Sequence, residues 1–145
     1  MNAKAVHAFE EIQIGDTLGP QPLFISRKQS LAYCDAAGLA GVPRFTDDEG
    51  ARKEGLPGMI IPGNMSAALI GKMVTDWATA GRGELTRIGT TYRSPVRPDM
   101  QLTLQGFITN ADPEQRTAEL DIWIENEDGD KQVTATATVK FPAKA

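Results

Sequence analysis

One strongly apolar segment, residues 64–80, most constrains what this chain can fold into. Apolar side chains recur there at helical spacing and cover more than one face, at positions 65, 67, 68, 69, 70, 73, 74, 77 and 78. A helix that is apolar on most sides has to be buried, so the rest of the chain must wrap around it. Asn64 is the expected N-cap because its side chain can accept from a free backbone N–H, and Gly81 should end the helix.

Four stretches after this helix alternate apolar and polar side chains, which is the pattern of half-buried strands. They cover residues 85–93, 101–109, 120–124 and 133–141. Tight turns join them, and one of these turns contains the Asp128-Gly129 pair that is typical of hairpins. The sequence therefore predicts a meander of four antiparallel strands with one face covered by the apolar helix.

The first part of the chain predicts shorter elements. Residues 12–14 alternate in polarity, which indicates a short strand or an extended segment, and residues 23–25 are a second short strand. Ser26 and Gln29 have the spacing of a capping box, so a helix is expected over residues 26–38.

Residues 39–57 look irregular, with a short helical turn expected at residues 47–53. Several glycines and prolines interrupt this stretch. A loop of this length inside a small domain is usually functional or mobile. This stretch is therefore the first place to look for a site.

Composition restricts the function classes. The 145 residues fit a single domain, 1–145, and the formal net charge of −4 argues against nucleic acid as a partner. Cys34 is the only cysteine and His7 the only histidine, so we expect no intrachain disulfide and no metal site. We expect Cys34 to be a buried, inert thiol. No signal peptide and no membrane span is visible in the sequence, so a cytoplasmic protein is expected.

Four segments carry a resemblance to a known family: FEEIQIGD at 9–16, AYCDAAG at 32–38, IPGNM at 61–65 and YRSPVRPD at 92–99. Their order and spacing resemble the MaoC-like hot-dog proteins over nearly the whole chain. The best-known members of that family hydrate trans-2-enoyl thioesters to (R)-3-hydroxyacyl thioesters. The resemblance implies an α+β hot-dog fold, an antiparallel sheet wrapped around a long central helix. It also implies an acyl-CoA substrate and no cofactor beyond the coenzyme A of that substrate.

The chain departs from the family at the catalytic pair. Active members carry a segment like Y-A-x-x-S-G-D-x-N-P-x-H, whose aspartate and histidine activate a water and move a proton. Here Leu39 stands at the aspartate position, and Arg44 or Phe45 stands at the histidine position. Leucine takes no proton and arginine stays charged, so unaided hydration should be slow.

The resemblance leaves a thioester cradle at the start of the apolar helix. It assigns the carbonyl contact to the backbone N–H of Gly63, an oxyanion donor, with Pro62 and Asn64 beside it. The helix dipole places partial positive charge at this end, and a glycine lets the thioester approach the backbone closely. The alternative is that Pro62-Gly63 only starts the helix.

Other candidate site residues are charged. Arg44, Arg93 and Arg97 are candidates for the phosphates of coenzyme A, because guanidinium donors match phosphate geometry. Asp47 and Asp48 are the nearest candidates for a substitute general base, although capping a short helix is the stronger interpretation of Asp47.

Four functions remain open on the sequence. The first is a thioester-binding subunit of a hydratase or dehydratase whose hot-dog partner supplies the aspartate and histidine. The others are a self-sufficient hydratase, a hot-dog thioesterase using Glu54, and a non-enzymatic acyl-CoA-binding protein. Exposed strand edges predict a homodimer or a hetero-oligomer in every case.

Overall fold

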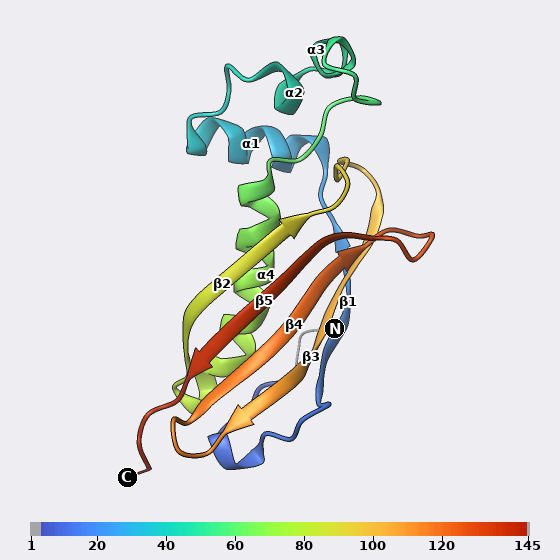
Figure 1. Cartoon of the computed structure of the whole chain (residues 1–145). Helices are drawn as coiled ribbons and strands as arrows, with labels where there is room; N and C mark the ends of the chain where they lie inside the picture. Colours follow the sequence, from blue (N-terminus) through green and yellow to red (C-terminus); the bar gives the residue numbers. More distant parts are fainter. Residues whose placement is uncertain (1–3, 145) are drawn as a thin grey trace.

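A five-stranded antiparallel sheet packs on one long helix, α4 (Gly63–Ala78), as Figure 1 shows. The computed structural model describes residues 4–144. The strands are β1 (Thr17–Phe24), β2 (Glu84–Tyr92), β3 (Gln101–Asp112), β4 (Thr117–Glu125) and β5 (Lys131–Lys140). The predicted α+β architecture, a sheet around a buried helix, is therefore confirmed.

The predicted meander is wrong at its first step. The sheet order is β1-β3-β4-β5-β2, so β2 pairs with β5 and β1 lies beside β3. Alternation along a strand reports which side chains point inward, but it does not report which strand lies alongside. β1 also begins well before the expected residue 23 and runs past Pro20 and Pro22. The prolines are tolerated because β1 is an edge strand.

The apolar face of α4 forms the centre of the core. Ile70, Met73, Val74 and Trp77 are buried on it. They pack with the inward side chains of the sheet, which include Leu104, Ile108, Leu120, Ile122, Ile124, Val133 and Val139. A 3-10 turn, η2 (Thr79–Gly81), follows α4. It ends at Gly81, the residue expected to end the helix.

The start of α4 differs from the prediction in one respect. The helix begins at Gly63, one residue earlier than expected, and Pro62 is the N-cap with no side-chain hydrogen bond. The prediction of Asn64 as the N-cap is wrong because Asn64 already lies inside the first turn. The first backbone N–H groups therefore have no capping side chain.

Three short helices lie above the N-terminal end of α4 in Figure 1. They are α1 (Arg27–Ala37), α2 (Pro43–Thr46) and α3 (Asp48–Lys53). The capping box of α1 and its end at Gly38, in the left-handed conformation with φ 75°, are confirmed. The helical turn expected at 47–53 is α3, whereas α2 falls in a stretch predicted to be irregular.

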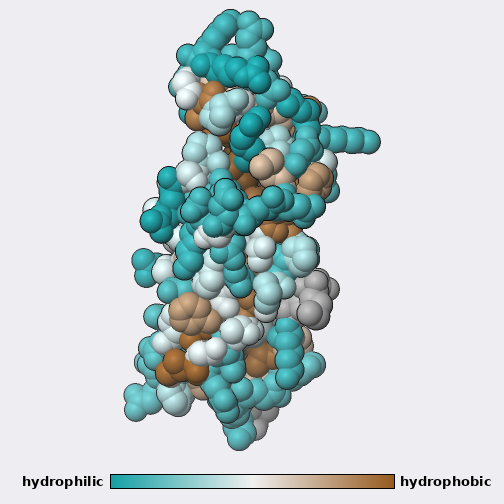
Figure 2. All heavy atoms as spheres, turned by 90° about the vertical axis from the view of Figure 1, so that its right-hand side faces the viewer, coloured by the Kyte–Doolittle hydropathy of each residue, from teal (hydrophilic) through white to brown (hydrophobic). Residues whose placement is uncertain are grey.

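The N-terminal segment forms a 3-10 turn, η1 (Phe9–Glu11), and residues 12–14 form no strand. Figure 2 shows the β1 side of the molecule as mostly hydrophilic, with apolar side chains in separate small patches. No helix among residues 4–144 combines the length and apolar character that crossing a bilayer requires.

Candidate functional site

A cavity of about 430 Å³ lies at the start of α4. Helix α2, the segment leading into α4, the first turn of α4, the end of β2 and the turn after it all contribute to its wall. The lining residues are Arg44, Phe45, Ile60, Ile61, Gly63, Ser66, Tyr92, Arg93, Ser94, Pro95, Val96 and Val133. The stretch 39–57 thus contributes to the site through α2.

Gly63 and Asn64 present the first two amides of α4. The next two amides, of Met65 and Ser66, both bond to the carbonyl of Pro62, at 3.0 and 3.4 Å. Neither the Gly63 nor the Asn64 N–H has a hydrogen-bond partner in the part of the chain that the structure describes. Because α4 is a 16-residue helix, its dipole adds partial positive charge at these amides. These N–H groups can donate to an oxygen that carries partial negative charge.

Tyr92 covers one side of Gly63. Its hydroxyl donates to the carbonyl of Gly63 at 2.9 Å. A Cβ atom added at Gly63 would lie 2.8 to 3.2 Å from three atoms of the tyrosine ring. A larger residue at position 63 would therefore need the tyrosine ring to shift, whether or not a ligand approaches there.

The three candidate phosphate-binding arginines are not in one place. Arg44 and Arg93 line the cavity at α4, whereas Arg97 lines a separate cavity of about 230 Å³. Arg44 pairs with Glu54 at 3.0 Å on the surface. The Nε atom of Arg97 is buried and has no partner among the described residues.

Both candidate carboxylates hold local structure. Asp47 caps α3 by accepting from two backbone N–H groups of its first turn, at 3.0 and 3.3 Å. Asp48 accepts from the backbone N–H of Met59 at 2.9 Å and pairs with Arg27 at 2.7 Å. Neither residue belongs to the lining of the cavity at α4. A role for either as a general base stays a prediction.

The surroundings of Asp48 favour its ionised form. The N–H of Met59 and then the guanidinium of Arg27 hold the pKa of the Asp48 carboxyl below its usual value. A depressed pKa means that the proton is bound weakly, which makes the carboxylate a poor base near neutral pH. Asp48 instead ties the start of α3 to α1 through Arg27 and to the segment that leads into α4 through Met59.

This pair gives a prediction for the pH dependence of stability. A carboxyl whose pKa is lowered in the folded state contributes stability above its unfolded pKa, and that stability is lost as the pH falls through the folded pKa. Asp48→Asn should therefore lower the urea midpoint at pH 7, and the gap to the wild type should close progressively in acid below the usual carboxyl range. Asp76→Asn, in the exposed pair with Lys72, is the control and should show little gap at any pH. A gap for Asp48→Asn that stays constant down to pH 2 would contradict this account.

The cavity at α4 has no acid–base pair of its own. No aspartate, glutamate, histidine or cysteine belongs to its lining, in the residues that the structure describes. Phe45 and Arg44, the two residues that the family resemblance offers for the histidine position, do line it. The cavity offers hydrogen-bond donors, positive charge and apolar walls, which suit binding and polarisation of a carbonyl.

The remaining candidates lie elsewhere or have structural roles. Pro62 is buried beside the cavity, and Asn64 is exposed on the first turn of α4. The Cys34 thiol is buried, and that burial raises its pKa, as expected of an inert thiol. His7 is exposed near the N-terminus. Within residues 4–144, no group of three metal-ligating side chains is close enough to hold an ion.

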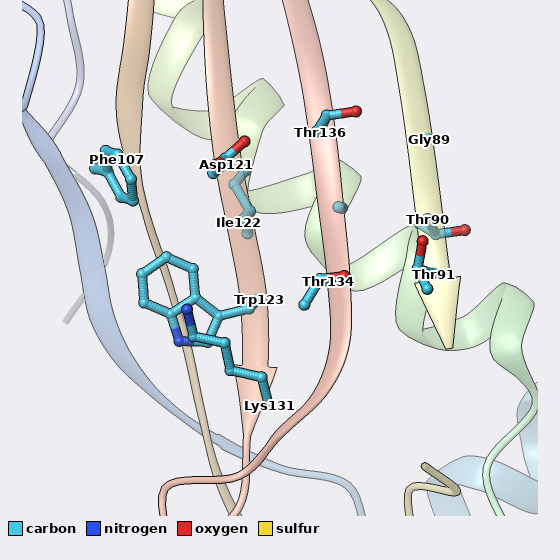
Figure 3. Close-up of a pocket in the computed structure, with 11 residues that line it drawn as sticks. Gly89, Thr90, Thr91, Phe107, Asp121, Ile122, Trp123, Lys131, Thr134 and Thr136 are labelled. Atoms are coloured by element: carbon cyan, nitrogen blue, oxygen red, sulfur yellow. The ribbon is translucent and has the colours of Figure 1, made fainter. Parts of the chain in front are cut away.

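A second cavity, of about 480 Å³, lies on the face of the sheet away from α4 (Figure 3). Trp123 stands at one side of it, with the ammonium group of Lys131 4.0 Å from the ring centroid and Phe107 edge-on at 6.1 Å. None of the candidate site residues from the sequence lines this cavity. It is separate from the site at α4.

The sequence interpretation missed Tyr92 and Ser66 as site residues. Ser66 is 1% exposed and lines the cavity from the first turn of α4. Tyr92 was part of a segment that carried the family resemblance, but nothing local shows that the end of β2 meets the start of α4. The packing of β2 against α4 brings these two segments together.

No protein-family model and no curated protein matches this sequence. Solved structures do match. The (R)-hydratase from A. caviae involved in PHA biosynthesis is 17% identical, with a TM-score of 0.82, over 92% of this chain and 99% of that one. The ChsH1-ChsH2 complex from Mycobacterium tuberculosis is 19% identical, with a TM-score of 0.79, over 90% and 98%.

A structure described as a MaoC-like dehydratase is 25% identical, with a TM-score of 0.81. The match covers 97% of this chain but 44% of that longer chain. The fold expected from the resemblance is therefore confirmed. This chain has the hot-dog fold, and its structural neighbours are MaoC-like dehydratases and (R)-hydratases.

Proposed function

We propose that this chain is a MaoC-like, thioester-binding subunit of an enoyl-CoA hydratase or dehydratase. A partner hot-dog chain would supply the aspartate and histidine. One observation carries the proposal: the cavity at the start of α4 combines the free amide of Gly63 with apolar walls, yet its lining contains no aspartate, glutamate, histidine or cysteine in the described residues. The substrate is an acyl-CoA thioester, and the proposal places the protein in the cytoplasm.

The cavity suits the parts of a thioester. The Gly63 amide would donate to the thioester carbonyl, and the helix dipole would stabilise negative charge on that oxygen as C2 changes its bonding. The acyl chain would lie on the apolar walls, which include Ile61, Val96 and Val133. Arg93 would face the phosphates of coenzyme A, joined by Arg44 when it leaves Glu54.

Hydration needs two more groups. A base must take a proton from water as its oxygen bonds to C3, and an acid must give a proton to C2, so that the elements of water add across the double bond. In the described lining, tyrosine, serine and arginine are the only side chains with ionisable or hydroxyl groups. A positioned acid–base pair contributes about 10²–10⁴-fold to the rate. The partner chain would provide that contribution.

The free edge of the sheet at β2 is where a partner would dock. β2 is a terminal strand, so one row of its backbone groups has no strand beside it. Ile88, in the middle of β2, is 37% exposed, and Tyr92 at its end borders the cavity. The ChsH1-ChsH2 neighbour is a complex of two chains, which supports an assembly of this kind.

Reconstitution tests the proposal. This chain is co-expressed with each Asp/His-bearing hot-dog chain of its own genome, and hydration of crotonyl-CoA is measured on the purified complex. We expect one partner to copurify and to turn over at least about tenfold faster with this chain than without it. Ile88→Lys on the β2 edge should abolish copurification, whereas Phe24→Lys on the β1 edge should not.

Two outcomes would contradict the proposal. If no Asp/His-bearing chain binds or gains activity, the partner is not part of the function. Tight binding of butyryl-CoA without turnover in any complex would then favour a non-enzymatic acyl-CoA-binding protein. Release of free thiol by the chain alone, lost in Glu54→Gln, would favour a thioesterase.

A further inference from the structure

Tyr92 differs from the buried apolar side chains around the cavity at α4. Ile61, Val96 and Val133 are 1 to 4% exposed and belong to the hydrophobic core, so they cannot move without disturbing the fold. Tyr92 is 50% exposed. Tyr92 can therefore be replaced by another residue without loss of core packing.

Two hydrogen bonds hold the Tyr92 ring in one place. The hydroxyl donates to the Gly63 carbonyl at 2.9 Å and accepts from the Thr90 hydroxyl at 3.2 Å. Thr90 lies two residues back on β2, so its side chain is on the same face of the strand. An exposed tyrosine at a strand end would otherwise be free to rotate. These bonds make it a fixed wall.

The ring lies against the residue whose amide would hold the thioester carbonyl. Its Cζ, Cε1 and Cε2 atoms fill the space where a Cβ of residue 63 would be. In the binding mode proposed above, a substituent on the carbon next to the carbonyl would compete with the ring for this space. An unbranched acyl chain, whose C2 carries only hydrogens besides the chain itself, needs less width there.

We propose that Tyr92 determines specificity at this site, selecting unbranched acyl-CoA thioesters against those branched at C2. This inference rests on the proposed thioester-binding function, which it deepens by naming the substrate class. Shape discrimination in an apolar pocket is commonly about 10–200-fold for one methylene group. We expect a preference of about tenfold or more for the unbranched thioester.

Butyryl-CoA and isobutyryl-CoA test the inference because their acyl groups have the same atoms and differ only in branching at C2. Calorimetric titration of the purified chain should show the wild type binding butyryl-CoA at least about tenfold more tightly. Tyr92→Ala should bind the two thioesters within about twofold of each other. Tyr92→Phe keeps the ring but loses both hydrogen bonds, so it should show an intermediate preference.

Controls separate specificity from folding. Thr91→Ala changes the neighbouring position on the opposite face of β2 and should keep the wild-type preference. If Tyr92→Ala does not fold, Tyr92→Leu, which keeps an apolar side chain but removes the ring, carries the same expectation.

The outcomes distinguish the two proposals. A Tyr92→Ala or Tyr92→Leu variant that folds and retains the full preference overturns the role of Tyr92 and leaves the thioester site standing. A wild-type protein that binds butyryl-CoA without any preference over isobutyryl-CoA also overturns the role of Tyr92. A wild-type protein that binds neither thioester overturns both.

Discussion

The purified chain alone should hydrate crotonyl-CoA about 10²–10⁴-fold more slowly than a hot-dog hydratase with a positioned acid–base pair. The reason is the lining of the cavity at α4, which offers donors for the carbonyl but no base for water within the described residues. The family resemblance also predicts that Leu39 occupies the position of the catalytic aspartate. Loss of absorbance of the conjugated enoyl thioester measures the rate directly.

The (R)-hydratase from A. caviae, assayed at the same concentration, is the reference for this experiment. Asp47→Asn and Asp48→Asn are the matched variants, because these two carboxylates are the candidates for a substitute general base that the sequence offers. We expect both to leave the low rate of the isolated chain unchanged, since each carboxylate holds backbone structure outside the cavity lining. A rate near that of the reference enzyme, abolished by either substitution, would establish a self-sufficient hydratase instead.

Gly106→Ala should be strongly destabilising. Gly106 faces inward in β3, between Leu18 of β1 and Ile122 of β4. An added Cβ would collide with the backbone carbonyl oxygen of Asp121 and lie 2.8 Å from Cγ1 of Ile122. Because backbone atoms of a central strand cannot swing aside, the cost should reach about 3 kcal/mol, the upper part of the usual overpacking range.

Urea unfolding followed by circular dichroism measures this loss. Gly89→Ala is the matched control, because Gly89 also lies in a strand but its added Cβ would meet only the Thr136 hydroxyl, at an ordinary 3.5 Å. The control should stay within about 0.5 kcal/mol of the wild type. A Gly106→Ala protein as stable as the control would mean that β3 and β4 separate more easily than their register indicates.

Local patterns in the sequence predicted the elements well where the pattern was strong. The apolar run of α4 and the alternation of β3, β4 and β5 each report burial of the residue's own side chain. The capping box at Ser26 and the left-handed Gly38 are likewise decided within a few residues. Weak alternation failed at residues 12–14, where a turn around Gly15 precedes β1.

The site was only partly predictable. Gly63, Arg44 and Arg93 do line one cavity, as a shared site would require, whereas Arg97 lies in another and the two aspartates cap or brace helices. The local sequence around an arginine next to a turn does not show which way its guanidinium points. Distances between residues far apart in the chain are set by tertiary packing, which cannot be inferred from a short stretch of sequence.

The sequence by itself determined that a buried helix and a set of half-buried strands must pack together, because the spacing of apolar residues indicates which side chains are buried. It also determined both ends of α1, through the capping box at Ser26 and the glycine at 38. Only the tertiary structure decided that β2 lies beside β5 and β1 beside β3. Backbone hydrogen bonds between strands are the same for any neighbour, so the choice among neighbours is made by the packing of the whole core. The packing of β2 against α4 places Tyr92 on Gly63.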